Sequence, residues 1–185
     1  GFVESYRDIN DFDFMDCSIL ENHVSGIEVL RNEMNSGKAL YLACAYGHGA
    51  KLLDALGYLV KGIDIRKDAI EEARKRELDA SVADALKLPF KDEVFDITIS
   101  RDFLRPDYLR EESIKQCLNE QFRILKKEGI AINYSLLSKF KFSGIDFATE
   151  QRLKLDEIEN LPFKEFRRYT VNFKDMMQYV DVFEK

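Results

Sequence analysis

Two aspartates in the first half of the chain stand directly after short, largely apolar segments. Asp64 follows Leu59–Ile63, and Asp84 follows Ala80–Ala83. Apolar runs of this length are typical of strands buried in a sheet, and ligands of parallel sheets bind where the strands end. A carboxylate at one such end can accept hydrogen bonds from both hydroxyls of a ribose, and a second one nearby can accept a bond from an adenine amino group. The pattern predicts a nucleotide-like ligand held by Asp64 and Asp84.

A turn of small residues is the second chemical signal. It follows the apolar segment Ala39–Cys44 and leads towards leucines at helical spacing, Leu52, Leu53 and Leu56. Small side chains let a ligand approach the backbone, and the exposed N–H groups at the start of a helix favour a polar ligand group. We therefore expect the ligand to lie against the residues of this turn, which are Ala43, Cys44, Ala45, Tyr46 and Gly47.

These signals also have purely structural interpretations. Asp64 could cap the following helix, and Asp84 could form a turn. His48 lies between two glycines, and a single histidine there is more typical of a loop residue than of a catalytic base. The basic pair Arg167 and Arg168 falls in a strand-like segment and is expected to face solvent, so we assign no site to it.

Strand-like and helix-like segments alternate along the chain, and this order positions the predicted ligand residues. The apolar segments typical of strands are 39–44, 59–63, 80–83, 94–100 and 130–135. Apolar residues recur at helical spacing over 18–37, 47–56 and 114–125, and over 67–78 Glu71 and Glu72 stand four residues before Lys75 and Arg76, as in a helix. Such alternation predicts a parallel sheet with helices on both faces. The tail differs, because Phe163–Val171 and Met177–Phe183 are placed to form an antiparallel hairpin. An α/β fold, mainly parallel with a C-terminal hairpin, is therefore predicted.

Length and composition limit the class of protein. A chain of 185 residues with 45% hydrophobic and 34% charged residues is typical of one globular domain. We expect a single domain over 1–185, with an N-terminal arm and helix over 1–37, a ligand-binding core over 38–136, and a cap segment with the terminal hairpin over 137–185. The formal net charge of −6 argues against a nucleic-acid partner, because such partners require neutralised phosphates.

Two further absences in the sequence lead to expectations about compartment and metal content. The longest apolar run falls short of the roughly 18 residues that span a bilayer, and the first residues lack the pattern of a signal peptide. A cytoplasmic protein without a membrane span is therefore expected. Cys17, Cys44 and Cys117 lack the paired spacing of a zinc or redox centre, so we expect reduced thiols and no metal site.

Five segments occur in the order in which class I S-adenosylmethionine-dependent methyltransferases carry their motifs. They are LACAYGHG at 42–49, GIDI at 62–65, VADALKLPF at 82–90, VFDITIS at 94–100 and RILKKEGIAI at 123–132. Each motif alone is weak, but five matches in order are specific. The chain therefore resembles this family, in its type 11 form, over roughly Ala39 to Leu136. The resemblance implies a Rossmann-like three-layer sandwich with a seven-stranded sheet.

The resemblance also implies a cofactor, S-adenosylmethionine, and a small-molecule substrate. The residues that it places around the cofactor are Ala43–Gly47 beside the methionine part, Asp64 and Ile65 at the ribose, Asp84 and Ala85 at the adenine, and Ser100 and Arg101 at the junction with the substrate. Arg101 and Asp102 are the nearest polar candidates for substrate contact. Methyl transfer to a ready nucleophile needs mainly positioning, so no catalytic residue is assigned.

The first motif departs from the family pattern. The family has an acidic residue followed by three alternating glycines, whereas this chain has Tyr41, Ala43, Ala45 and Gly47. Each alanine adds a methyl group where the cofactor approaches the backbone, and alanine disfavours positive φ. The activity implied is methyl transfer to a small or medium-sized molecule; the alternative is a catalytically inactive methyltransferase-like protein that binds or scaffolds. A dinucleotide-dependent dehydrogenase ranks behind both, because the first turn lacks the GxGxxG spacing.

Overall fold

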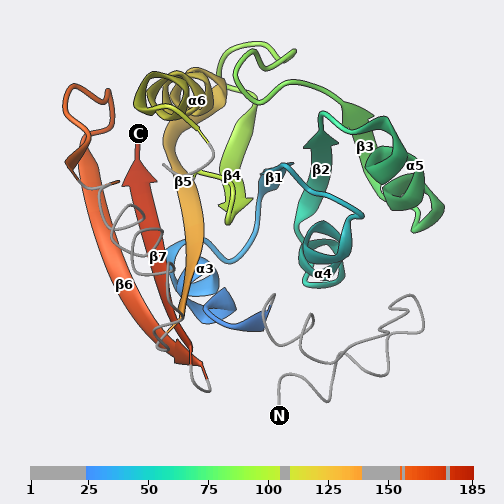
Figure 1. Cartoon of the computed structure of the whole chain (residues 1–185), viewed down its shortest axis with the longest axis horizontal. Helices are drawn as coiled ribbons and strands as arrows, with labels where there is room; N and C mark the ends of the chain where they lie inside the picture. Colours follow the sequence, from blue (N-terminus) through green and yellow to red (C-terminus); the bar gives the residue numbers. More distant parts are fainter. Residues whose placement is uncertain (1–23, 105–108, 139–154, 156, 174–175) are drawn as a thin grey trace.

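A mixed sheet of seven strands organises the chain (Figure 1). The computed structural model describes residues 24–104, 109–138, 155, 157–173 and 176–185. The strands are β1 (Lys38–Leu42), β2 (Leu59–Asp64), β3 (Asp79–Val82), β4 (Phe95–Arg101), β5 (Leu125–Ser138), β6 (Glu165–Phe173) and β7 (Met176–Glu184). Their order in space is β3-β2-β1-β4-β5-β7-β6, so β3 and β6 form the two edges.

The strand directions agree with the predicted topology. β1 is parallel to both of its neighbours, so Tyr41 aligns with Gly62 of β2 on one side and with Ile99 of β4 on the other. β7 is antiparallel to β5 and to β6. The prediction of a mainly parallel sheet ending in an antiparallel hairpin is therefore confirmed. Chain progression reverses direction between β1 and β4, which is where ligand crevices of such sheets open.

Helices cover the two faces of the sheet and close two apolar cores. The helices are α3 (Ile27–Glu33), α4 (His48–Ala55), α5 (Lys67–Lys75) and α6 (Glu111–Ile124). On one face Leu30 of α3 and Ile70 of α5 share a core with Ile99, and on the other Leu118 of α6 shares a core with Leu42. Figure 1 shows α6 well separated from the other helices. None of the described helices is long and apolar enough to cross a membrane.

Phe95 and Asp96, at the start of β4, have different structural roles. Phe95 is 1% exposed and meets the ring of Phe90 edge-on, with 5.1 Å between the ring centres. The neighbouring Asp96 accepts a hydrogen bond from the backbone N–H of Lys38 through Oδ2, at 2.9 Å. The aromatic ring fills the core, and the carboxylate fixes where β1 enters the sheet.

The helix predicted over 18–37 is described from Val24 onwards, and there it is interrupted: Val24 is helical, Ser25 and Gly26 form a turn, and the helix resumes as α3. α3 starts at Ile27, because Gly26 has a φ of 75° and interrupts the helix. A Cβ at Gly26 would lie 2.7 Å from the side-chain oxygen of Gln178, so the chain passes too close to the sheet for a larger residue. Residues 18–23 of the predicted helix, and residues 139–151 of the predicted cap segment, lie outside the described residues.

The connection from β3 to β4 contains no helix and is held from outside by α6. Arg123 of α6 donates hydrogen bonds to the backbone oxygens of Phe90 and Leu88, at 2.7 and 3.0 Å. The same guanidinium pairs with Asp92 at 2.9 Å and with Glu120 at 2.7 Å. The Arg123 side chain thus supplies hydrogen bonds to backbone oxygens that would be paired within a helix if this connection formed one.

The pair Arg167–Arg168 does not face solvent as predicted, because the two side chains point to opposite faces of β6 and each finds a carboxylate there. Arg167 pairs with Glu33 of α3 at 2.7 Å and with Glu184 of β7 at 2.8 Å. Arg168 forms a two-pronged pair with Asp181, at 2.7 and 3.0 Å, and the Asp181 side chain is 1% exposed.

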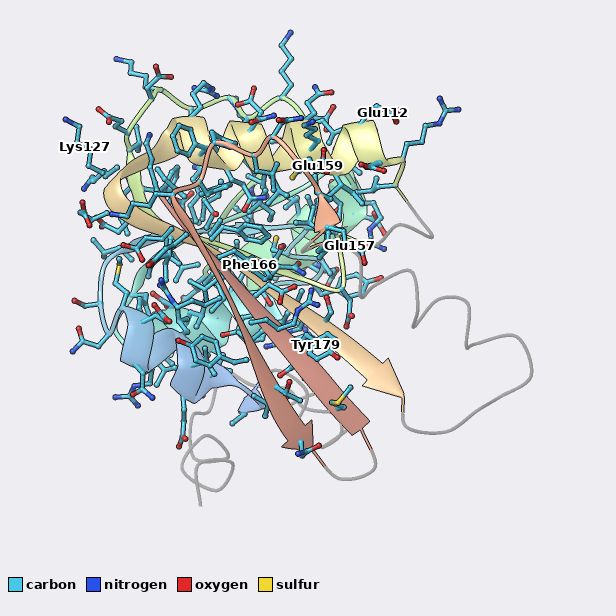
Figure 2. All side chains as sticks on the ribbon, turned by 90° about the vertical axis from the view of Figure 1, so that its left-hand side faces the viewer. Glu112, Lys127, Glu157, Glu159, Phe166 and Tyr179 are labelled. Carbon is cyan, nitrogen blue, oxygen red and sulfur yellow. The ribbon has the colours of Figure 1, made fainter. Side chains whose placement is uncertain are left out.

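The aromatic residues of the hairpin explain how Arg168 is held against Asp181. Its Cζ lies 4.5 Å from the ring centre of Tyr179 and 5.6 Å from that of Phe166. Figure 2 faces this edge of the sheet and shows Phe166 and Tyr179 at different levels along the hairpin. Cation–π contact and the paired hydrogen bonds together favour a single register of β6 on β7.

Glu33 should make the stability of the fold depend on pH. The hydrogen bond from Arg167 lowers the pKa of Glu33 below its ordinary value of 4.5. A carboxyl with a lowered pKa stabilises the folded chain above its unfolded pKa and loses that effect as pH falls through the folded pKa. We expect Glu33→Gln to cost about 1 kcal/mol of unfolding free energy at pH 7 and less at pH 3.

Urea denaturation at pH 7, 5 and 3 measures this difference. The matched control is Glu28→Gln, because Glu28 is exposed on the same helix. A Glu33→Gln effect that is the same at pH 3 as at pH 7 would contradict the assignment.

Candidate functional site

A cleft of about 760 Å³ opens at the carboxyl ends of β1, β2, β3 and β4. Its wall consists of Ala43, Ala45, Ile63, Asp64, Ile65, Arg66, Ala83, Asp84, Ala85, Leu86, Arg101, Asp102, Phe103 and Leu109. This volume lies within the range of small-molecule sites, and the lining combines apolar side chains with a few polar ones, as such sites do. The cleft is therefore where the sequence predicted a ligand.

Asp64 is the most constrained polar group of the cleft. It is 7% exposed, its Oδ2 accepts the backbone N–H of Ala45, and its Oδ1 accepts that of Arg66, both at 2.9 Å. One bond holds the loop between β1 and α4, and the other holds the start of α5. A carboxylate oxygen can accept a second hydrogen bond, so both oxygens keep acceptor capacity for a ligand hydroxyl.

The loop after β1 keeps the backbone that glycines would adopt. Ala43 and Ala45 each have a φ of 50°, in the left-handed region that alanine disfavours. Gly47 has a φ of 88°, and a Cβ there would lie 3.1 Å from that of Ala73 in α5. Both alanines therefore adopt a left-handed conformation that suits glycine, and they place methyl groups on the cleft wall at the cost of backbone strain.

Asp84 both forms a turn and lines the cleft. Its Oδ1 accepts the backbone N–H of Leu86 at 2.9 Å, and its carbonyl accepts that of Lys87 at 3.1 Å. Ala85, next to it, is 9% exposed. Asp84 therefore forms a turn, as the structural interpretation predicted, and its carboxylate also lines the cleft.

Most of the predicted ligand residues come together in the cleft wall, namely Ala43, Ala45, Asp64, Ile65, Asp84, Ala85 and Arg101. The structure places Cys44, Tyr46, Gly47 and Ser100 outside the cleft wall. Cys44 faces Gly62 in the core, and Tyr46 is 42% exposed with Arg66 over its ring. Gly47 packs on α5, and Ser100 is buried and donates to Asn133 Oδ1 at 2.8 Å. Alternation along the chain explains this, because successive residues point in different directions.

The cleft also contains residues that the sequence did not reveal. Arg66, Leu86, Phe103 and Leu109 line it, and none had been assigned a role. Leu86 stands in the segment after Asp84, and its apolar side chain was a usable signal. Phe103 and Leu109 follow β4 in a stretch without regular periodicity, so only the fold brings them to the wall.

Tyr41 occupies the place of the expected acidic residue and lies beside Arg101. It is 5% exposed, and burial raises the pKa of its hydroxyl, so it carries no charge at neutral pH. The Cζ of Arg101 lies 4.3 Å from the ring centre of Tyr134. Neither Tyr41 nor Tyr46 belongs to the cleft wall, so neither fills the space between Asp64 and Asp84.

The arrangement suits a ligand with a flat ring and a sugar. Asp84 and Asp64 provide acceptors on neighbouring strand ends, and Ile65, Leu86 and Leu109 provide apolar surface nearby. Ala43 and Ala45 contribute only methyl side chains to the wall at the end of β1. On these observations the residues present fit a nucleoside-containing cofactor.

Sequence comparison relates the chain to one family. A family model described as a methyltransferase domain matches residues 40–133. An uncharacterised protein of Haemophilus influenzae is 31% identical over 109 residues, which are 54% of this chain and 43% of that protein. The chain spans about half the length of the curated relatives it matches.

Structural comparison shows the same fold in solved structures that the chain covers almost completely. A crystal structure of a protein from Pyrococcus horikoshii is 26% identical, with a TM-score of 0.67 over 100% of this chain and 99% of that one. A Thermotoga maritima protein, described as an S-adenosylmethionine-dependent methyltransferase and possible histamine N-methyltransferase, is 19% identical. Its TM-score is 0.66 over 100% of this chain and 97% of that one.

Replacing a strained alanine by glycine should stabilise the fold. At a φ of 50° the Cβ of Ala43 or Ala45 is unfavourable, and glycine removes it. We expect Ala43→Gly and Ala45→Gly each to raise the unfolding free energy by about 1 kcal/mol, measured by urea denaturation.

The control is Ala50→Gly, which lies inside α4 and is buried. Glycine in a helix interior costs about 1 kcal/mol, so the control should change stability in the opposite direction. If Ala43→Gly and Ala45→Gly lowered the unfolding free energy as Ala50→Gly does, the left-handed conformations of Ala43 and Ala45 would be contradicted.

Proposed function

Because the chain belongs to the methyltransferase-domain family of class I S-adenosylmethionine-dependent enzymes, we propose that it transfers a methyl group from S-adenosylmethionine to a small or medium-sized acceptor. The observation that carries this proposal is the open cleft at the ends of β1 to β4, with Asp64 and Asp84 on neighbouring strands. The acceptor atom is left open.

Each part of the cleft has a proposed role in holding the cofactor. Asp84, with Ala85 beside it, would receive the adenine, and Asp64 would accept hydrogen bonds from the ribose hydroxyls. Ala43 and Ala45 would lie along the methionine part. When bound, S-adenosylmethionine supplies a methyl group on a positively charged sulfur, which is reactive without further activation by the protein.

The protein's own residues contribute position and shielding from water. Phe103 and Leu109 stand on the wall beyond β4 and would cover the reacting end, and Arg101 with Asp102 would meet the acceptor there. Holding two reactants in line accounts for a large share of catalysis in reactions of this kind.

Transfer through a cysteine is not supported by the described residues. Burial raises the pKa of the Cys44 thiol to about 12 and that of the Cys117 thiol to about 12. Thiols with such values keep their protons at neutral pH and are poor nucleophiles. Direct transfer from the cofactor to the acceptor is therefore the proposed route.

Two observations favour an active enzyme over a scaffold. Neither Tyr41 nor Tyr46 lines the cleft, so neither fills it. Ala43 and Ala45 adopt the left-handed conformation that suits glycine at these positions. The Thermotoga maritima protein, described as a possible histamine N-methyltransferase, is covered over 97% of its length, which supports a small acceptor for a fold of this size.

Cofactor binding is the first test. We expect calorimetric titration to show binding of S-adenosylmethionine and S-adenosylhomocysteine, and Asp64→Ala to weaken both by roughly 10- to 100-fold, the worth of hydrogen bonds to a charged group. Denaturation of the same samples is needed, because Asp64→Ala also releases the N–H groups of Ala45 and Arg66.

The control is Asp79→Ala, whose side chain is 70% exposed at the start of β3, away from the strand ends that form the cleft. It should bind as the unaltered protein does. Absence of binding at millimolar ligand would contradict the proposal.

Turnover is the second test. Incubating the protein with methyl-labelled cofactor and pools of small metabolites should label one acceptor class, and the label should disappear with Asp64→Ala. Tight cofactor binding without transfer to any pool would favour the scaffold instead.

A further inference from the structure

Arg66 lines the cleft beside Asp64, the carboxylate to which the proposed function assigns the ribose. The Nε atom of Arg66 lies 3.5 Å from Oδ1 of Asp64, so a group that contacts one side chain is within reach of the other. We propose that Arg66 is a specificity-determining residue that donates hydrogen bonds to the ribose oxygens, and that Tyr46 positions its guanidinium. The inference rests on the proposed function and adds a donor to the acceptor that Asp64 provides.

The chemistry of a ribose hydroxyl requires a donor as well as an acceptor. A hydroxyl group donates one hydrogen bond and can accept others, whereas an ionised carboxylate only accepts and a guanidinium only donates. Asp64 accepts two backbone N–H groups and keeps capacity for a third bond, so it can accept the hydroxyl proton. Arg66 can donate to the hydroxyl oxygen. Because both side chains are charged, each of these bonds is stronger than one between neutral groups.

An arginine at position 66 is unfavourable for the helix that follows. Arg66 is the N-cap residue of α5, with a φ of −87° and a ψ of 116°, and its side chain makes no capping hydrogen bond to the described helix. Serine, threonine, aspartate and asparagine are preferred at N-caps, because their short side chains bond the exposed N–H groups. A positive charge at a helix N-terminus is unfavourable as well. Helix stability therefore does not explain this arginine, whereas a cleft that needs a donor does.

Tyr46 holds the guanidinium of Arg66 from outside the cleft wall. The Cζ of Arg66 lies 5.5 Å from the ring centre of Tyr46, within the range of a cation–π contact. The Tyr46 backbone is joined to α5, since Arg76 donates a hydrogen bond from Nη1 to the Tyr46 carbonyl at 3.4 Å. The Arg66 side chain is 49% exposed, and a long exposed side chain loses rotamer freedom when it binds a ligand. Contact with Tyr46 restricts this side chain beforehand and so reduces the entropic cost of binding.

The test compares S-adenosylhomocysteine with its 2′-deoxy and 3′-deoxy analogues by calorimetry. We expect Arg66→Met to weaken binding of S-adenosylhomocysteine by roughly 10-fold, the worth of one hydrogen bond to a charged group. Binding of at least one deoxy analogue should weaken by less than about 3-fold, because that analogue lacks the hydroxyl that Arg66 contacts. Arg66→Lys keeps the charge and a donor, so its affinity for S-adenosylhomocysteine should lie between those of Arg66→Met and the unaltered protein.

The control is Lys67→Met, which removes the same charge from the next residue, an exposed lysine that does not line the cleft. It should leave the affinities of all three ligands unchanged, and urea denaturation of each variant separates binding from folding. Equal weakening of all three ligands by Arg66→Met would overturn the assignment of Arg66. Failure of the unaltered protein to bind S-adenosylhomocysteine at millimolar concentration would instead overturn the proposed function, and this inference with it.

The role of Tyr46 is tested separately, with Tyr46→Leu and Tyr46→Phe. Losing the ring should weaken binding of S-adenosylhomocysteine by roughly 2- to 5-fold, the range of an exposed cation–π contact, and Tyr46→Phe should retain the affinity. Combined with Arg66→Met, the change Tyr46→Leu should have no further effect, because Tyr46 acts through Arg66. An equal loss with and without Arg66→Met would overturn the positioning role of Tyr46.

Discussion

The cleft depends on two hydrogen bonds to one buried carboxylate. Asp64 accepts the N–H of Ala45 on one oxygen and that of Arg66 on the other. These bonds involve an ionised group away from water, so they are stronger than ordinary backbone bonds, and losing them would leave buried N–H groups unsatisfied. The loop after β1, the end of β2 and the start of α5 are thereby held together. Structural and ligand-binding interpretations of Asp64 are therefore compatible, because the residue has enough acceptor sites for both.

The loop that Asp64 holds is energetically costly. A left-handed conformation costs an alanine roughly 1–2 kcal/mol, and this loop has two such residues, Ala43 and Ala45. A domain stabilised by about 5–15 kcal/mol in total can carry such a cost only if other contacts impose it. The hydrogen bond to Ala45 and the tight packing of Gly47 on α5 impose it here. Strain and cleft therefore occur in the same few residues.

The sequence predicted the sheet well and the side-chain environment poorly, for physical reasons. Buried strands such as β1 and the terminal hairpin leave apolar runs that can be read directly, and Asp64 and Asp84 follow from the ends of those runs. The conformations of Ala43 and Ala45 could not be read, because the same residue types also fit ordinary turns. The partners of Arg167 could not be found either, since Glu33 stands 134 residues away and comes close only through the fold. Arg66 reaches the cleft for the same reason.

The connection between β3 and β4 forms one wall of the cleft and is joined to α6 by side-chain hydrogen bonds. Residues 84–92 have no hydrogen-bonded ladder. Arg123 of α6 donates to the backbone oxygens of Leu88 and Phe90 and pairs with Asp92, and Gln116 of α6 donates to the backbone oxygen of Leu86. Segments with few backbone bonds of their own open locally at a lower free energy than the whole domain unfolds. Amide protons of this wall should therefore exchange with solvent faster than those of β1 or β4. The shape of this wall of the cleft then depends on two side chains of α6, Arg123 and Gln116, that are not part of the cleft lining.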